Sequence, residues 1–225
     1  MKLLCLDTTL NKCAVQIILP GKITPVLRDK TQPPSDVIPF LVNKSLSDSS
    51  LKISDLDGVI VTTGPGNFTS LRVGISFGVG LSKGLSIPIY GISSLQAIMF
   101  SHRKNCKEHK NFLVTSEARG NDYFFQLFDS LSNPISNPIK TSPEEAKIIF
   151  LENNLFFLGS GSLGVAKTLD QEKNIICNND NIDFLLVFES MKKNISYYQN
   201  NLQPVYLSDP VAEKKDPLWF AKKKI

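Results

Sequence analysis

A buried strand that ends in a glycine-x-glycine turn and runs directly into a helix is predicted twice in this sequence. The first copy of the turn is Gly-Pro-Gly at residues 64–66, and the second is Gly-Ser-Gly at residues 159–161. In both copies, three short strands and one helix are predicted ahead of the buried strand, so the two turns occupy matching places. This repetition indicates an internal duplication and limits the fold to two similar halves.

The first repeat, residues 1–101, opens with three predicted strands at residues 3–6, 13–19 and 23–27. Such closely spaced strands pair antiparallel, because a parallel connection needs a dozen or more residues. Ser35 is the expected N-cap of the first helix. The remaining elements are predicted as a helix over 36–46, a strand over 58–62, a helix over 68–83, a strand over 87–92 and a helix over 94–100.

The second repeat, residues 111–207, begins again with three strands, and residues 208–225 form a C-terminal tail. Its elements are predicted as strands over 112–116, 122–128 and 138–141, a helix over 143–150, a strand over 155–158, a helix ending near 169 and a strand over 174–177. Two lobes that each carry a mixed sheet are typical of the α/β actin-like architecture, with its two ribonuclease-H-like lobes. A single doubly wound sheet is the alternative, but the first 30 residues leave no room for its first helix.

Composition narrows the class of protein further. The 225 residues are 42% hydrophobic and carry a net charge of +4, which allows a sizeable core and is too weakly basic to indicate nucleic-acid binding on its own. The sequence predicts no signal peptide and no membrane span. The four cysteines are far apart and form no C-x-x-C pair, which favours a reduced, cytoplasmic protein.

The first glycine turn is a candidate anion site. It lies between a buried strand and a helix, and free N–H groups at the positive end of a helix can bind an anion. No lysine follows the glycines, which excludes a P-loop. The alternative is that the glycines only form a tight turn. The candidate anion-binding residues are Gly64, Gly66, Asn67 and Thr69.

The helix that follows carries a stripe of small residues. Ser70, Gly74, Gly78 and Ser82 recur at every fourth position, so they line one side of the helix, beside an apolar row that includes Leu71 and Ile75. Each glycine weakens a helix by roughly 1 kcal/mol relative to alanine, so a close contact must compensate. Either this side packs on the sheet of its own lobe, or part of it contacts another protein.

Four segments resemble a known family. GPGNFTSLRVG, from residue 64, is similar to the G-P-G-S-F-T-G-L-R-I-G signature of the TsaB (YeaZ) family of tRNA threonylcarbamoyladenosine biosynthesis proteins. LCLDTTLNKCAVQI, IPIYGISSLQAI and NLQPVYL resemble its opening strands, its I-P-x-x-G-V-S-S-L segment and its P-x-Y-L segment. The family often carries a His-Ser-Glu run before its first helix, whereas residues 33–36 here are Pro-Pro-Ser-Asp.

The resemblance implies an actin-like fold and a role in making N6-threonylcarbamoyladenosine in tRNA. It implies a non-catalytic subunit without a cofactor of its own, which supports a TsaD-type transferase and works with a TsaE-type ATPase. ATP is then used by the assembled system, tRNA is met through the complex, and the isolated chain forms a homodimer. The family pairs through the helices of the first lobe, and the matching residues are Val37, Phe40, Leu41, Ser70, Leu71, Gly74, Ile75, Gly78 and Ser82.

Two features could bind a nucleotide instead. Residues 159–164 match G-x-G-x-x-G, and Asp7 ends the first strand, where actin-like ATPases hold metal-bound phosphate. Their structural alternatives are a tight turn and a turn carboxylate that bonds the N–H groups of Thr8 or Thr9. A small actin-like ATPase or sugar kinase is therefore the alternative function. It would need a second acidic residue, and none is evident, because Asp180 and Asp183 belong to an Asn-rich loop.

No metal or hydrolase site is expected. His102, Cys106 and His109 are spaced for one helical face, but lysines and an arginine surround them. They include the only two histidines, so the chain lacks the H-x-x-x-H motif of catalytic TsaD proteins and any evident Ser-His-Asp arrangement of a peptidase-like hydrolase. The tail carries Trp219 and several lysines, which indicates either a solvated end or contact with RNA.

Overall fold

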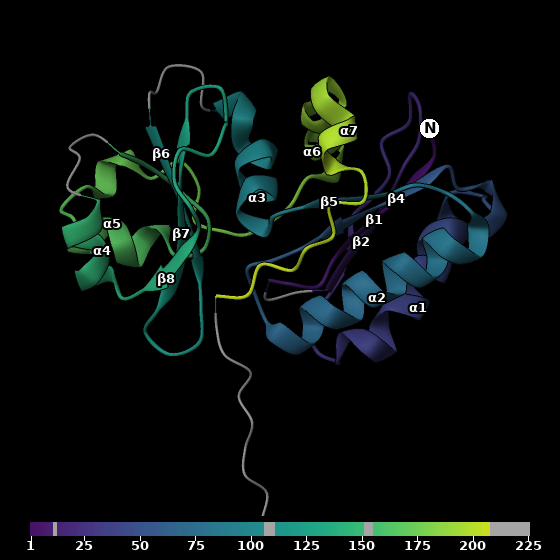
Figure 1. Ribbon diagram of the computed structural model, residues 1–225, viewed down its shortest axis with the longest axis horizontal. Coiled ribbons are helices and arrows are strands. Elements are labelled where there is room, and N and C mark those ends of the chain that lie inside the picture. Colours follow the sequence, from purple (N-terminus) through teal and green to yellow (C-terminus); the bar gives the residue numbers. More distant parts are fainter. Residues whose placement is uncertain (11–12, 106–110, 151–154, 208–225) are drawn as a thin grey trace, which may run out of the picture.

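Two mixed α/β lobes stand side by side in the computed structural model, which describes residues 1–10, 13–105, 111–150 and 155–207 (Figure 1). The predicted tail, residues 208–225, lies outside the described residues, as do Cys106 and His109. No helix within the described ranges is long and apolar enough to cross a membrane.

The first lobe is built on a five-stranded sheet in the order β3-β2-β1-β4-β5. β1 pairs antiparallel with β2 and parallel with β4, so the sheet is mixed, as expected. The central strands are fully buried because helices cover both faces of the sheet. The strands are β1 (Leu3–Asp7), β2 (Cys13–Ile18), β3 (Leu27–Asp29), β4 (Gly58–Thr62) and β5 (Ile89–Ile92).

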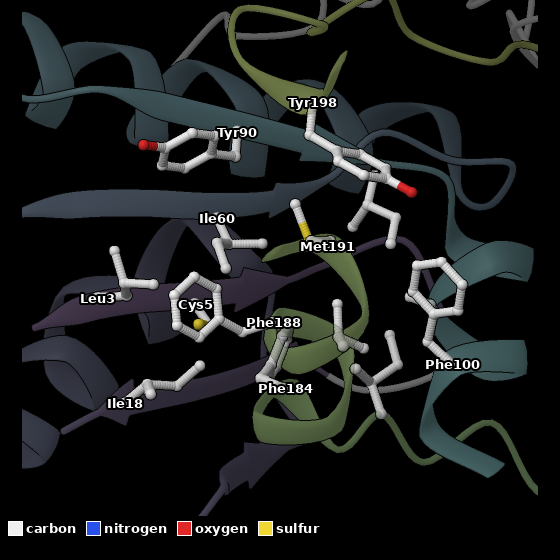
Figure 2. Close-up of a cluster of buried hydrophobic side chains, with 14 of the residues drawn as sticks. Leu3, Cys5, Ile18, Ile60, Tyr90, Phe100, Phe184, Phe188, Met191 and Tyr198 are labelled. Atoms are coloured by element: carbon white, nitrogen blue, oxygen red, sulfur yellow. The ribbon is translucent and has the colours of Figure 1, made fainter. Parts of the chain in front are cut away.

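Side chains alternate between the two faces of this sheet. Leu4 and Leu6 of β1 point to the face covered by α1 (Pro34–Asp48) and α2 (Phe68–Leu85). Leu3 and Cys5 point to the other face, where they meet α6 (Phe184–Met191), as Figure 2 shows. The buried side chains on both faces form the core that holds the lobe together.

The second lobe repeats the topology on a smaller scale. Its four-stranded sheet runs β8-β7-β6-β9, which matches the order of the first four strands of the first lobe. α4 (Pro143–Ile149) and α5 (Ser162–Thr168) cover its outer face, while α3 (Ser94–His102) lies between the lobes and packs on its inner face. The strands are β6 (Asn111–Glu117), β7 (Tyr123–Asp129), β8 (Ile139–Thr141) and β9 (Phe156–Leu158).

Three local predictions were wrong. The third strand lies at Leu27–Asp29, after the predicted range of 23–27. The first helix begins at Pro34 with Pro33 in the cap position, so Ser35 is inside the helix and not its N-cap. The strand predicted over 174–177 is reduced to a single bridge between Phe157 and Ile175, because a 3₁₀ turn at Glu172–Asn174 precedes it.

Residues 184–207 return to the first lobe, although the sequence predicted a second lobe over residues 111–207. α6 buries Phe184 and Met191 against the first sheet. After α7 (Ile195–Tyr198), the chain follows the free edge of β5, where the N–H of Asn200 donates to the carbonyl of Ile89 at 3.0 Å. The edge strand is thereby covered, and residues 184–207 belong in space to the first lobe.

Candidate functional site

Asp7, at the carboxyl end of β1, is held in a buried turn. Its side chain is 3% exposed. Its Oδ1 accepts hydrogen bonds from the N–H of Thr9 at 3.0 Å and from the hydroxyls of Thr9 and Thr62 at 2.7 Å each. Burial raises the pKa of the Asp7 carboxyl, although these hydrogen bonds oppose the shift. The turn-forming role predicted for Asp7 is confirmed, with Thr9 as its N–H partner.

Asp180 is a second hydrogen-bonded carboxylate, held at the glycine turn of the second lobe. Its carboxylate accepts from the N–H and the hydroxyl of Ser160, both at 2.7 Å, and from the hydroxyl of Ser116 at 2.8 Å. Burial raises its pKa as well. No local sequence pattern indicates this role, because Ser160 and Ser116 lie 20 and 64 residues away from Asp180.

The two carboxylates line one cavity between the lobes. This acidic cavity, of about 300 Å³, is bounded by Asp7 and Arg28 from the first lobe, by Glu117 and Ser160 from the second, and by the connecting loop that carries Asp180. The expectation that no second acidic residue accompanies Asp7 is therefore wrong. Three carboxylates against one guanidinium repel a polyphosphate unless a cation intervenes.

The glycine turn of the second lobe has its N–H groups engaged. Ser160 donates to Asp180, and the N–H of Gly161 donates to the carbonyl of Thr115 at 3.2 Å. The N–H of Ser162 donates to the carbonyl of Gly159, and that of Leu163 donates to Asn178 Oδ1 at 3.1 Å. Four successive donors that could contact a phosphate are thus already satisfied within the chain, which supports the structural interpretation of the G-x-G-x-x-G match.

The glycine turn of the first lobe is equally tight. Gly66 lies so close to the carbonyl of Thr9 that a Cβ has no room, and Gly64 has a φ of +94°, a conformation that favours glycine. Asn67 caps α2 as predicted, since its Oδ1 accepts from the N–H of Ser70 at 3.0 Å, and its own N–H donates to Thr9. Anion binding by Gly64, Gly66, Asn67 and Thr69 stays a prediction.

The small-residue stripe of α2 faces its own sheet. A Cβ on Gly74 would collide with the side chain of Thr8, and one on Gly78 would lie 2.5 Å from Val61 Cγ1. Ser82 donates its hydroxyl to the carbonyl of Ile87 at 2.5 Å. Small residues are required here because the helix lies directly on the strands. Six of the predicted interface residues are therefore buried within the lobe, which favours packing on its own sheet over contact with another protein for Leu71, Gly74, Gly78 and Ser82 of α2 and Val37 and Leu41 of α1.

The outer face of the same two helices remains apolar. Phe40 on α1 is 65% exposed. On α2, Ile75 and Val79 are half-buried, and Ser70 lies near the start of the helix, also half-buried. α1 and α2 lie next to each other on one side of the first lobe (Figure 1), and Val79 lies on the side of α2 towards Ile89 of β5. Phe40, Ser70 and Ile75 are the predicted interface residues that this outer face retains.

Metal-ligating side chains are not grouped in the described ranges. No set of three or more His, Cys, Asp or Glu side chains there could hold a metal ion. His102 is half-buried, and burial lowers its pKa. Its proposed neighbours in a metal cluster, Cys106 and His109, lie outside the described residues.

Comparison with known proteins finds similarity to two kinds of tRNA threonylcarbamoyladenosine protein. A profile of the family described as TsaD, tRNA N6-adenosine threonylcarbamoyltransferase, matches residues 32–133. The tRNA threonylcarbamoyladenosine biosynthesis protein TsaB of Haemophilus influenzae is 27% identical over 96% of this chain and 98% of its own length.

Solved structures support the fold. YeaZ from Pseudomonas aeruginosa covers 92% of this chain and 99% of its own, with a TM-score of 0.72 and 19% identity. An inorganic polyphosphate/ATP-glucomannokinase from Arthrobacter sp. strain KM covers 86% of this chain and 99% of its own, with a TM-score of 0.53 and 13% identity. The predicted actin-like architecture is confirmed.

Proposed function

We propose that this chain, which is similar to a TsaB protein along almost its whole length, is a non-catalytic subunit of the machinery that makes N6-threonylcarbamoyladenosine in tRNA. Its role is to bind and support a TsaD-type transferase. The observation that carries the proposal is the likeness to a TsaB protein along almost the whole chain.

The state of the two glycine turns supports a non-catalytic role. An actin-like kinase or ATPase grips phosphates with free turn N–H groups, whereas here Asp180 and Asn178 occupy the donors of the second turn. The described residues also hold no group of side chains that could bind a metal ion. Among the described residues of the acidic cavity, no group is evident that would position a phosphate or activate a water molecule.

The outer face of α1 and α2 is the surface that suits the partner. It presents the exposed ring of Phe40 on α1 and the half-buried Ile75 and Val79 on α2. Aromatic side chains surrounded by aliphatic ones commonly anchor protein interfaces. The same surface would join two copies when the partner is absent. A TsaE-type ATPase and tRNA would join through the complex in the cytoplasm, and ATP would be used by the assembled system.

Co-purification tests this function. Tagged full-length chain should capture a co-expressed TsaD-type transferase and support threonylcarbamoylation of tRNA in a reconstituted assay. Phe40→Asp should lower capture by about tenfold or more, because it places a charge at the centre of the apolar face. The matched control is Ile23→Asp, since Ile23 is 86% exposed and lies away from α1 and α2.

A folded Phe40→Asp protein with full capture would show that this face is not the partner surface. If the unmodified chain neither captured the transferase nor changed tRNA modification, the proposed function itself would be wrong.

A further inference from the structure

A second cavity between the lobes shares no lining residue with the acidic cavity. This tyrosine cavity, of about 460 Å³, lies between the first turn of α3, strand β7 with the loop after it, and the segment that follows α6. Among the described residues, none that lines it is Asp, Glu, Lys, Arg or His. A ligand that fits here is therefore uncharged, because a charge would lose its hydration without gaining a partner.

Gln126 of β7 brings unused hydrogen-bonding capacity to this wall. The residue is 7% exposed. Its Nε2 donates to the carbonyl of Ser136 at 3.0 Å, and its buried Oε1 has no partner among the described residues. An amide NH₂ carries two hydrogens, so one N–H and one acceptor remain available. Gln126 lines the cavity and its terminal torsion is soft, so its amide can turn towards a ligand there.

Flat rings provide the other walls. Tyr197 is 62% exposed and meets Tyr198 edge-on, with ring centroids 5.1 Å apart. Tyr206 leans on Phe68, and its hydroxyl accepts from Arg72 Nε at 3.0 Å. These contacts restrain the tyrosine rings. The cavity therefore offers aromatic surface to a planar group at little entropic cost.

Planarity, neutrality and a donor next to an acceptor together define a nucleobase. Glutamine reads adenine through two bonds, in which its Oε1 accepts from the N6 amine and its NH₂ donates to N7. Guanine presents acceptors at both positions, which the bare Oε1 opposes. We propose that the tyrosine cavity binds an adenine base, with Gln126 contacting N6 and N7 and Tyr197 stacking on the ring.

Ligand analogues test the contacts one at a time. The full chain is titrated with adenosine, purine riboside, which lacks the N6 amine, and 7-deazaadenosine, which lacks N7, and binding is followed by tyrosine fluorescence and NMR. Adenosine should bind in the millimolar range or better. Each analogue should bind about tenfold or more weakly, because one of the two bonds is lost. Equal binding of all three would overturn the role of Gln126.

Protein variants provide the second arm. Tyr197→Ala, at an exposed position, should keep the fold and weaken adenosine binding by about tenfold, since stacking is lost. Gln126→Leu should remove discrimination between adenosine and purine riboside. Ile23→Ala is the control, because Ile23 is 86% exposed and does not line the tyrosine cavity. Unchanged affinity of a folded Tyr197→Ala protein would overturn the stacking assignment.

Short oligoadenylate distinguishes a base in an RNA strand from a free nucleoside. Tighter, salt-sensitive binding of the oligonucleotide indicates RNA, whereas equal affinity per site indicates the nucleoside. Preference for a proline-rich peptide over every nucleoside would overturn the proposal. This inference does not rest on the proposed function. A chain that does not bind adenosine can still capture the transferase, and a chain that binds adenosine can fail to capture it.

Discussion

The two lobes descend from one pattern but stabilise their glycine turns in different ways. In the first lobe, the turn is closed from outside: Thr9 accepts from Asn67, and the N–H of Val205 near the chain end donates to Thr63 at 2.8 Å. In the second lobe, the Asp180 carboxylate fills the turn directly. The same geometry thus persists with different partners, which indicates that the turn itself, and not a ligand, is what both lobes preserve.

The helices differ as well. α1 and α2 have 15 and 18 residues, whereas α4 and α5 have seven each. At 1.5 Å per residue, the first lobe presents a helical face more than twice as long. A long, regular face with an exposed aromatic ring suits a partner protein better than two short helices do. The comparison therefore favours the first lobe as the place of the proposed partner surface.

The largest expected effect on stability comes from disrupting the packing of α2 on the first sheet. Gly74→Leu forces a side chain into Thr8 and should lower the free energy of unfolding by about 1–3 kcal/mol or more. The matched control in the same helix is Gly80→Leu, where a Cβ meets nothing within 4 Å and helix propensity predicts a gain of about 0.5–1 kcal/mol. Urea denaturation of both variants tests whether the stripe belongs to the core of the lobe. Equal stabilities of the two variants would contradict this.

Removing the carboxylate of the second turn should have a moderate effect. Asp180→Ala leaves three buried donors on Ser160 and Ser116 without an acceptor, which should cost about 1–3 kcal/mol of stability. Asp122→Ala removes a surface ion pair with Lys140 and should cost no more than about 1 kcal/mol. Thermal unfolding of the two proteins compares them directly. Similar melting temperatures for both would show that Asp180 does not hold the turn.

A smaller effect should appear in the pH dependence of stability. The pKa values of Asp7 and Asp180 are raised by burial from 3.8, so the folded state binds their protons more tightly than the unfolded chain does. Stability should therefore be greatest at low pH, as far as these two groups are concerned, and decline as the pH rises from about 3.8 through the folded pKa values.

Asp7→Asn isolates the contribution of the first lobe. Its Oδ1 can still accept the three hydrogen bonds, but the group no longer titrates, so the slope of unfolding free energy against pH should flatten in that window. Chemical denaturation across the acidic range measures the slope. An unchanged slope in Asp7→Asn would mean that the pKa of Asp7 is ordinary.

Sequence alone predicted most of the sheet order, because short turns force antiparallel strands and buried strands recur before each glycine turn. It missed α6, although Asp183 caps that helix by accepting from the N–H groups of Leu185 and Leu186. It also left open whether the stripe of α2 packs on its own sheet or contacts another protein. Helical spacing shows which residues share a side but not whether that side meets a sheet or solvent. Asp180 was inaccessible to any local pattern, since its partners are distant in sequence.

The last prediction is that the isolated protein shows no ATPase activity above background. Three carboxylates line the acidic cavity, but the purified chain should hydrolyse ATP no faster than background. The reason is that N–H groups of the second glycine turn, which would position phosphates, already donate to Asp180 and Asn178. Release of inorganic phosphate from partner-free protein measures this, with Asp7→Asn as the comparison, since that change keeps the turn. Turnover that is clear in the natural chain and lost in Asp7→Asn would establish the small actin-like ATPase or sugar kinase instead. Equal, background rates in both proteins would leave the carboxylates as parts of the fold.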